Sequence, residues 1–442
     1  MDRLNVMYIF TDQQYAGAMS CAGNEDLHTP AMDRLASEGT RFERAYCTYP
    51  LCSPSRASMF AGKHPHELGV TSNGLPIAEA YRPAELGHLL SAAGYECVYG
   101  GKWHVPEIAI PETHGFRRIC GFDDPGLPRA CEAFLEADHD RPFFLVAGFD
   151  NPHNICEWRR QQNLPWGEIG APPRVEDCPT LPANFAIPPF EPEAVRFATH
   201  ADPYIYPGAR YSDEQWRRYR WAYFRLVEKV DAQVGLILNA LDAAGLAKNT
   251  VVLFSSDHGD HHGANHLVQK SFLYEESIRV PMIVRHPQRA GGNVDGEHLV
   301  SNGLDVYATV CDLAGVGVPE HTEGRSLIPL MSPGSDHAWR PNVAVETKTG
   351  GRRSDGRAII TGRYKYVAYA WGAHREALFD LEHDPGEMVN LAVASRHAAA
   401  LQQHRDLLRE WCARTGDTFY GGHYSHPDTP FIVPGDAYPQ SG

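Results

Sequence analysis

One short stretch combines a thiol, a helix start and a fixed positive charge: Leu51-Cys52-Ser53-Pro54-Ser55-Arg56. Ser53 can cap a helix and Pro54 suits its first position, so Cys52 is expected directly before a helix N-terminus. Free backbone N–H groups and the helix dipole stabilise an anion there and lower the pKa of a thiol. Arg56 adds a positive charge one turn further on. The stretch can therefore hold an oxyanion against a nucleophile; the alternative is an inert, buried cysteine beside a capped helix.

Further reactive side chains follow the carboxyl ends of predicted strands. Each strand is read from a short apolar run rich in β-branched or aromatic residues. Ligands in open α/β sheets bind at the carboxyl ends of strands. The strands that carry Asp12 and Asp257 are expected to be neighbours in the sheet. The predicted strands and the groups that follow them are Asn5–Thr11 with Asp12 and Gln13, Glu96–Tyr99 with Lys102 and His104, Pro142–Phe149 with His153, and Thr250–Ser255 with Asp257 and His258.

Three of these motifs together carry a family resemblance. Cys-x-Pro-Ser-Arg resembles the signature of the sulfatases, in the alkaline phosphatase superfamily, whose cysteine is oxidised to formylglycine after translation. Gly-Lys-Trp-His, which contains Lys102, and Asp257-His258 resemble two further landmarks of that family in the same order. The resemblance extends from about Asn5 to about Leu391. It implies an α/β fold, with a mixed, mostly parallel sheet sandwiched by helices and a smaller C-terminal α+β subdomain.

The resemblance also implies a role for each site residue. It implies one divalent metal ion held by Asp12, Gln13, Asp257, His258 and an oxygen of the modified Cys52. Many members have a second aspartate where this chain has Gln13. Oxygen-rich ligation favours Ca²⁺, while the histidine favours Mn²⁺ or Zn²⁺. The residues implied in catalysis are Cys52, Arg56, Lys102, His104, His153 and Lys270. The residues implied in substrate binding are Asn73, Lys102, His153 and Lys270, although Asn73 also fits a plain turn.

Sulfate monoester hydrolysis needs positive charge around the sulfate oxygens and an activated nucleophile. The resemblance implies that one hydroxyl of hydrated formylglycine attacks sulfur and that His153 or Lys270 protonates the departing alcohol. His104 then accepts the proton of the second hydroxyl as sulfate leaves. The expected enzyme is a sulfuric ester hydrolase that acts on a sulfated carbohydrate or on an aryl or alkyl sulfate. A formylglycine-generating enzyme is its expected maturation partner.

Two other functions remain open on the sequence. Gln13 and His258 resemble the phosphonate monoester and phosphodiester hydrolases that use the same machinery, whereas Lys102 and His104 resemble the sulfate branch. A non-catalytic anion-binding protein, in which Cys52 is never modified, is the third alternative.

Length and composition limit the architecture and the partners. The 442 residues exceed one ordinary core, so we expect a catalytic domain over residues 1–335 and a C-terminal subdomain over 336–442. The formal net charge of −15 argues against a nucleic-acid partner. No apolar run has transmembrane length and no signal segment is visible, so we expect no membrane partner and a cytoplasmic location. Ten cysteines without a Cys-x-x-Cys pair fit free thiols.

One long segment shows little periodicity. Residues from Cys156 to Tyr211 are rich in proline and aromatic side chains, which predicts a loop that forms a lid or binding wall. Its Trp158, Arg159, Arg160 and Trp166 either contact a sugar or an anionic group or form solvated surface. A long helix is expected next, capped by Ser212 and ending at about Leu241.

Overall fold

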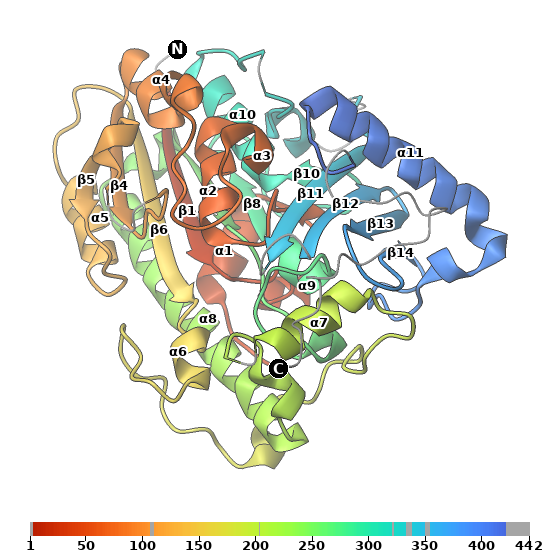
Figure 1. The fold of residues 1–442 in the computed structure, drawn as a ribbon. Coiled ribbons are helices and arrows are strands. Elements are labelled where there is room, and N and C mark those ends of the chain that lie inside the picture. The colour runs from red at the N-terminus through yellow and green to blue at the C-terminus, as the bar shows by residue number, and fades with distance from the viewer. Residues whose placement is uncertain are drawn as a thin grey trace.

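The computed structural model describes residues 3–106, 110–202, 204–320, 322–332, 338–349 and 354–420. Its centre is an eight-stranded sheet in the order β5-β4-β6-β1-β7-β8-β2-β9. A second, four-stranded sheet, β11-β12-β13-β14, belongs to the C-terminal part of the chain (Figure 1). The predicted fold class is therefore confirmed.

Most strands of the large sheet run parallel. Strands β5, β4, β6, β1 and β7 run parallel to one another, whereas β8 is antiparallel to both β7 and β2. Every residue of β1 is buried, as expected for a parallel strand that is covered on both faces. The strands are β1 (Asn5–Asp12), β2 (Thr40–Phe42), β4 (Glu96–Gly101), β5 (Arg117–Cys120), β6 (Phe143–Pro152), β7 (Thr250–Ser256), β8 (Met282–Arg285) and β9 (Asn293–Asp295).

The pairing of β1 with β7 brings two acidic residues to one edge of the sheet. Thr11 pairs with Ser256 in parallel register, so Asp12 and Asp257 leave their strands at the same level. The expectation that these strands are neighbours is confirmed. Strand β6 pairs with the other side of β1 and delivers the segment that carries His153.

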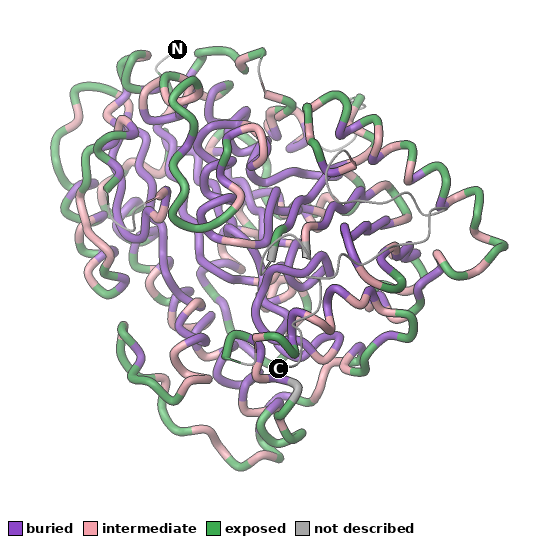
Figure 2. Tube along the Cα trace, in the orientation of Figure 1, coloured by how far each residue is buried: buried purple, intermediate pink, exposed green. Residues whose placement is uncertain are grey.

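Helices cover both faces of the large sheet (Figure 1). Helices α1, α5 and α8 pack against one another on one face, and α2, α4 and α10 pack together on the other. Figure 2 shows that buried residues concentrate in the sheet and on the inner sides of these helices. The helices are α1 (Pro30–Glu38), α2 (Cys52–Ala61), α3 (Pro65–Leu68), α4 (Leu86–Ala92), α5 (Leu127–Leu135), α6 (Ile155–Arg159), α7 (Glu193–Ala201), α8 (Asp213–Ala243), α9 (Glu275–Ile278), α10 (Asn302–Ala314) and α11 (Ala398–Thr415).

The C-terminal sheet packs against the last helix. Its strands are β11 (Asn342–Thr349), β12 (Ser354–Thr361), β13 (Tyr364–Tyr369) and β14 (Glu376–Asp380), paired as an antiparallel meander. Helix α11 covers one face and buries Leu408 and Trp411 against Ile359 and Tyr366. A short strand pair, β3 (Ala45–Tyr46) with β10 (Val300–Ser301), completes the fold. The division of the chain at residue 335 stays a prediction.

The structure corrects two local predictions. Helix α2 begins at Cys52, with Leu51 at the N-cap position, so Ser53 is not its cap. Pro54 is tolerated at the third helical position because that backbone nitrogen would have no intrahelical acceptor. The segment from Cys156 to Tyr211 is also not one loop, because it contains most of α6 and all of α7. Helix α8 is capped by Ser212 as predicted, through a reciprocal hydrogen bond with Gln215.

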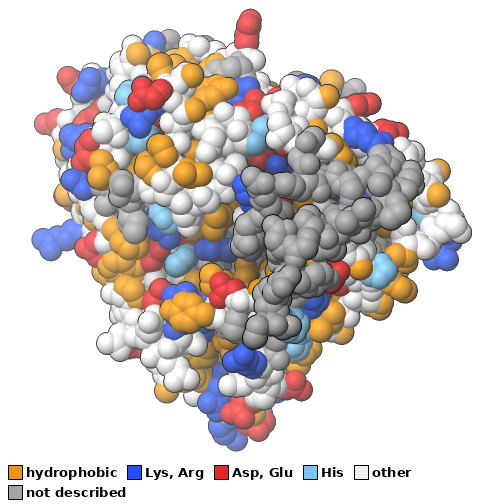
Figure 3. Space-filling view, in the orientation of Figure 1, with side chains coloured by type: hydrophobic (Ala, Val, Ile, Leu, Met, Phe, Trp, Pro, Cys, Tyr) orange, Lys and Arg blue, Asp and Glu red, His pale blue; other side chains and the backbone are white. Residues whose placement is uncertain are grey.

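Within the described ranges, every helix is too short or too polar to cross a membrane. On the face drawn in Figure 3, acidic and basic side chains are interspersed. All ten cysteines are free thiols, as expected.

Candidate active site

Three predicted side chains, those of Asp12, His258 and Lys270, surround the thiol of Cys52. Its Sγ lies 3.3 Å from His258 Nε2, 3.4 Å from Lys270 Nζ and 3.6 Å from Asp12 Oδ1. All four residues are buried. The site forms where the N-terminus of α2 meets the carboxyl ends of β1 and β7.

The donors on one side of this cluster fit a divalent cation. One ligand atom from each of Asp12, Cys52, Asp257 and His258 lies within 4.8 Å of the others. His258 Nδ1 is 3.0 Å from the carbonyl oxygen of Gly259, so Nδ1–H donates to it, while Nε2 lies 3.6 Å from Asp12 Oδ1 and 3.5 Å from Asp257 Oδ1. Metal-bound histidines typically have such a second hydrogen bond. Oxygen and imidazole donors suit Ca²⁺, Mn²⁺ or Zn²⁺, so the donor set fits the predicted metal without identifying it.

Arg56 joins the two carboxylates of this donor set. Its Nε donates to Asp257 Oδ2 at 2.8 Å and its Nη2 to Asp12 Oδ2 at 2.9 Å. The guanidinium also donates to the carbonyl oxygen of Lys102 and, at 3.4 Å, to that of Trp103. Its side chain is fully buried. These contacts make Arg56 the residue that holds Asp12 and Asp257 in place, whereas its predicted contact with an anionic substrate stays a prediction.

Two lysines bring positive charge to the other side of the cluster. Lys102 Nζ lies 2.6 Å from Asp12 Oδ2 and 2.9 Å from Asp150 Oδ1. Lys270 Nζ donates to Gln13 Oε1 at 2.7 Å and to the Cys52 thiol. Both side chains are buried, but their carboxylate and sulfur neighbours raise the pKa of each above its ordinary value, so both lysines are cations.

Gln13 has a φ of 74° and an amide that is held at both ends. Its Nε2 donates to Asp260 Oδ2 at 2.7 Å, while Oε1 accepts from Lys270. Its backbone N–H donates to Asp257 Oδ1 at 3.2 Å. Gln13 therefore connects a lysine to the carboxylates, and its predicted metal contact stays a prediction.

The charges around Cys52 determine its ionisation. Burial and the Asp12 carboxylate raise the pKa of the thiol, but Lys270, Lys102 and His258 lower it more, so the net pKa lies well below its ordinary value. Burial likewise raises the pKa of Asp12, but Lys102 and the other positive charges around it together lower it more, so Asp12 is ionised. The surroundings of residue 52 thus stabilise negative charge, as the sequence predicts for this helix start.

The structure also describes the three remaining predicted residues, His153, His104 and Asn73. His153 Nδ1 is 3.9 Å from Asp150 Oδ1 and its side chain is one-quarter exposed. Burial, Lys102 and Lys270 lower the pKa of His153 well below its ordinary value, so its imidazole is neutral. His104 has a φ of 62°, so the backbone is not extended there, and its buried Nδ1 has no hydrogen-bond partner among the described residues. Asn73 is exposed, and its Oδ1 accepts the backbone N–H of Ser53 at 3.1 Å, in the first turn of α2.

Asp150 is a site residue that the sequence did not reveal. It is 3% exposed and forms one of the two ion pairs of Lys102. It stands at the carboxyl end of β6, three residues before His153, which is the signal that could have revealed it. Asp260, which holds the amide of Gln13, was missed in a run otherwise rich in histidine.

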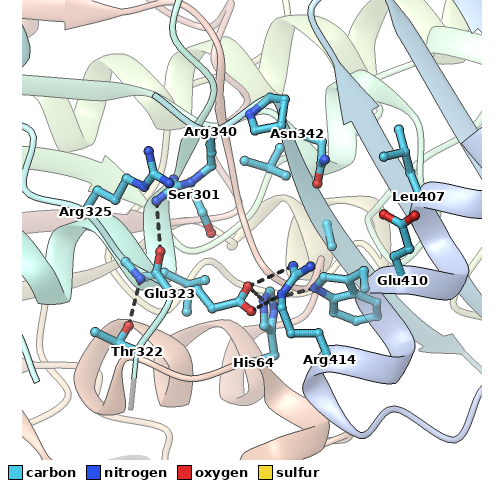
Figure 4. Close-up of a pocket in the computed structure, with 16 residues that line it drawn as sticks. His64, Ser301, Thr322, Glu323, Arg325, Arg340, Asn342, Leu407, Glu410 and Arg414 are labelled. Atoms are coloured by element: carbon cyan, nitrogen blue, oxygen red, sulfur yellow. Dashed lines mark hydrogen bonds and ion pairs between the residues drawn. The ribbon is translucent and has the colours of Figure 1, made fainter. Parts of the chain in front are cut away.

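A second cavity lies elsewhere in the fold. It has a volume of about 610 Å³ between α10, α11 and the segment that leads into β11 (Figure 4). Three of its charged side chains are already in ion pairs: Arg414 Nε donates to Glu323 Oε1 at 2.7 Å, and Arg340 pairs with Asp305. Figure 4 shows Glu323 between Arg414 and His64. His64 follows the C-terminus of α2, whereas Cys52 is at the opposite end of that helix. This cavity is therefore separate from the candidate active site.

Comparisons with known proteins agree with this fold. The family model described as Sulfatase matches residues 4–316, and the model described as N-sulphoglucosamine sulphohydrolase, C-terminal, matches residues 263–413. A Delta 4,5-hexuronate-2-O-sulfatase from Bacteroides thetaiotaomicron is 30% identical, over 95% of this chain and 90% of its own length. The solved structure of a 2-O GAG sulfatase superposes with a TM-score of 0.84 at 29% identity, over 95% of this chain and 94% of that chain.

A phosphonate monoester hydrolase of Agrobacterium radiobacter shares the fold. Its structure gives a TM-score of 0.77 at 21% identity, over 95% of this chain and 97% of that chain. The mixed, mostly parallel sheet between helices and the buried cluster of thiol, carboxylates and lysines are together typical of a hydrolase of anionic esters. Within that class, the chain belongs to the sulfatase family of the alkaline-phosphatase-like superfamily, and it is a sulfuric ester hydrolase.

Proposed function

We propose that this sulfatase hydrolyses the sulfate monoester of a carbohydrate, with one divalent metal ion and a formylglycine derived from Cys52. The observation that carries the proposal is the convergence on residue 52 of Asp12 and His258 on one side and Lys270 on the other. The relatives named for uronate and glycosaminoglycan sulfates support a saccharide substrate.

Asp12, Asp257 and His258 would hold the metal, which supplies a Lewis acid for the sulfate oxygens. A hydrated aldehyde at residue 52 would supply one hydroxyl as the nucleophile and a second hydroxyl that loses its proton when sulfate leaves and the aldehyde re-forms. Ca²⁺ remains our first choice of metal because two of the three side chains offer oxygen.

The residues around the metal site would divide the remaining work. Lys102 and Lys270 are cations that bind the sulfate oxygens and compensate the charge of the transition state. Lys270 is also the better proton donor to the departing alcohol, because His153 is neutral. A neutral His153 accepts a hydrogen bond from the alcohol part of the substrate. His104 accepts the proton of the second hydroxyl at its buried Nδ1.

The proposal is tested by producing the chain with and without a formylglycine-generating enzyme. We expect the peptide that contains residue 52 to have oxygen in place of sulfur only in the first preparation, and sulfate release from a sulfated uronate to follow that change. Cys52→Ala is the matched control. Efficient sulfate release by protein that contains only cysteine at residue 52 would reject the role of formylglycine.

The second candidate is a phosphonate monoester or phosphodiester hydrolase. Gln13 and His258, in place of aspartate and asparagine, favour it, and the shared fold is compatible with it. If mature, metal-loaded protein binds sulfate but hydrolyses no ester of either kind, the non-catalytic anion-binding alternative replaces both.

A further inference from the structure

Both oxygens of the Asp150 carboxylate are held by hydrogen bonds, which is more than is needed to balance the charge of Lys102. Its Oδ1 lies 2.9 Å from Lys102 Nζ, and its Oδ2 accepts from Asn154 Nδ2 and from Trp166 Nε1, both at 2.8 Å. Each oxygen therefore has a fixed partner, and the carboxylate cannot rotate without losing a hydrogen bond inside a buried site.

The backbone beneath this carboxylate is fixed as well. Both oxygens of Asp124 accept backbone N–H groups, from Asp150 at 2.8 Å and from Asn151 at 2.9 Å. Asp124 is itself fully buried. The end of β6 thus presents Asp150 toward Lys102 in one defined position.

The two carboxylates around Lys102 determine where its ammonium group points. An ammonium has three N–H donors, and two of them are directed at Asp12 Oδ2, 2.6 Å away, and at Asp150 Oδ1. In the part of the chain that the structure describes, no third acceptor is hydrogen-bonded to this nitrogen. Because the donors are tetrahedral, fixing two of them fixes the direction of the third.

We propose that Asp150 is a positioning residue, which aims the third N–H of Lys102 at the anionic group of the substrate and links this lysine to the segment that carries Trp166. The inference rests on the proposed function, in which Lys102 contacts the sulfate group. Without Asp150, Lys102 would keep only Asp12 as a partner, so the direction of its remaining N–H donors would no longer be fixed. Trp166 packs edge to face on Phe122, with ring centroids 5.1 Å apart, so its indole N–H is itself held in place.

Kinetics of three variants of the mature, metal-loaded enzyme test the inference. For Asp150→Ala we expect kcat to fall about 10- to 100-fold, the usual cost of losing the partner that orients an active-site ligand, with KM changed less than kcat. Asp150→Asn keeps an acceptor for Lys102 and should recover part of this loss. Trp166→Phe keeps the Lys102 contact and should cost less than either. Unchanged kcat in Asp150→Ala would overturn the inference.

Binding of inorganic sulfate, measured by calorimetry, separates positioning from charge and from folding. If Asp150 acted only through its charge, its removal would strengthen the binding of an anion. Positioning predicts the opposite: Asp150→Ala binds sulfate more weakly than wild type. Its metal content should be unchanged, and its melting temperature should be within a few degrees of that of Trp166→Phe. Sulfate binding that is as tight as in wild type, or tighter, would overturn the inference.

The wild-type rates keep this result distinct from the proposed function. If wild type hydrolyses phosphonate monoesters instead of sulfate esters, the proposed function fails, but the ratio of variant to wild-type kcat on that substrate still decides the role of Asp150. If wild type hydrolyses sulfate esters and the variants equal it, only the inference fails.

Discussion

Replacing Arg56 by methionine should destabilise the protein strongly while leaving its surface unchanged. The methionine side chain has a similar shape near the backbone, but the change would remove the ion pairs of 2.8 Å to Asp257 and 2.9 Å to Asp12. Both carboxylates are fully buried, so water cannot replace the guanidinium. Lys102 would still compensate Asp12, whereas Asp257 would lose its direct ion pair with the guanidinium.

The size of the effect follows from these contacts. Removing one partner of a buried ion pair costs about 3–5 kcal/mol, because the other charge stays buried without compensation. Unfolding entropy is roughly 2.1 cal/mol/K per residue, which for this chain gives about 0.9 kcal/mol/K. The expected fall in melting temperature of metal-free Arg56→Met is therefore about 3–5 °C. Arg56→Lys should cost less, since it keeps the charge and loses only the forked geometry.

Calorimetry in the presence of a chelator measures this directly. A matched series of wild type, Arg56→Lys and Arg56→Met should fall in that order of melting temperature. Adding Ca²⁺ should recover part of the loss, because the proposed metal site contains the same two carboxylates. A metal-free Arg56→Met that melts at about the wild-type temperature would refute the reasoning.

Three further predictions concern the nucleophile, the metal and pH. Cys52→Ala should fold normally yet lose kcat by about 10³-fold or more, since it removes the nucleophile; activity within tenfold of wild type would contradict this. Asp257→Ala should lose bound metal and activity together, and elemental analysis that finds full occupancy would reject its assignment as a ligand. Burial opposes protonation of His66, but its 2.7 Å hydrogen bond with Glu346 raises its pKa from 6.5 to about 9. The resulting stability, up to roughly 3 kcal/mol, is fully present below pH 6.5 and is lost as pH rises through 9. Urea unfolding of His66→Gln at pH 6 and pH 9.5 should show a smaller difference than wild type; an equal difference would exclude His66.

The sequence predicts the sheet better than the details of its loops. Continuous apolar runs such as Asn5–Thr11 are typical of parallel strands buried on both faces, and β1, β6 and β7 confirm them. Asp12 and Asp257 lie close together because β1 and β7, which lead to them, are neighbours in the sheet. The segment after Cys156 was predicted as one loop because proline and aromatic residues mask the periodicity of α7, which lies between prolines at 192 and 203.

The sequence predicts which residue types make up the site better than it predicts which of them contact one another. The resemblance of the motifs around Cys52, Lys102 and Asp257 to sulfatase landmarks indicates which groups are present, but pairing between them depends on the folded geometry. Arg56 illustrates this: one turn after Cys52 it suggests an anion contact, yet its side chain joins two carboxylates. Asp150 was missed because a single aspartate at the end of a strand is also common in turns.

The central claim is that this sulfatase prefers sulfate monoesters. A direct test compares kcat/KM of the mature enzyme for an aryl sulfate, several sulfated sugars, a phosphonate monoester and a phosphodiester. Lys102 and His104 would leave little room for the second substituent of a phosphodiester, so we predict that at least one sulfate ester has the highest kcat/KM. A phosphonate monoester or phosphodiester that is cleaved faster than every sulfate ester would contradict the claim.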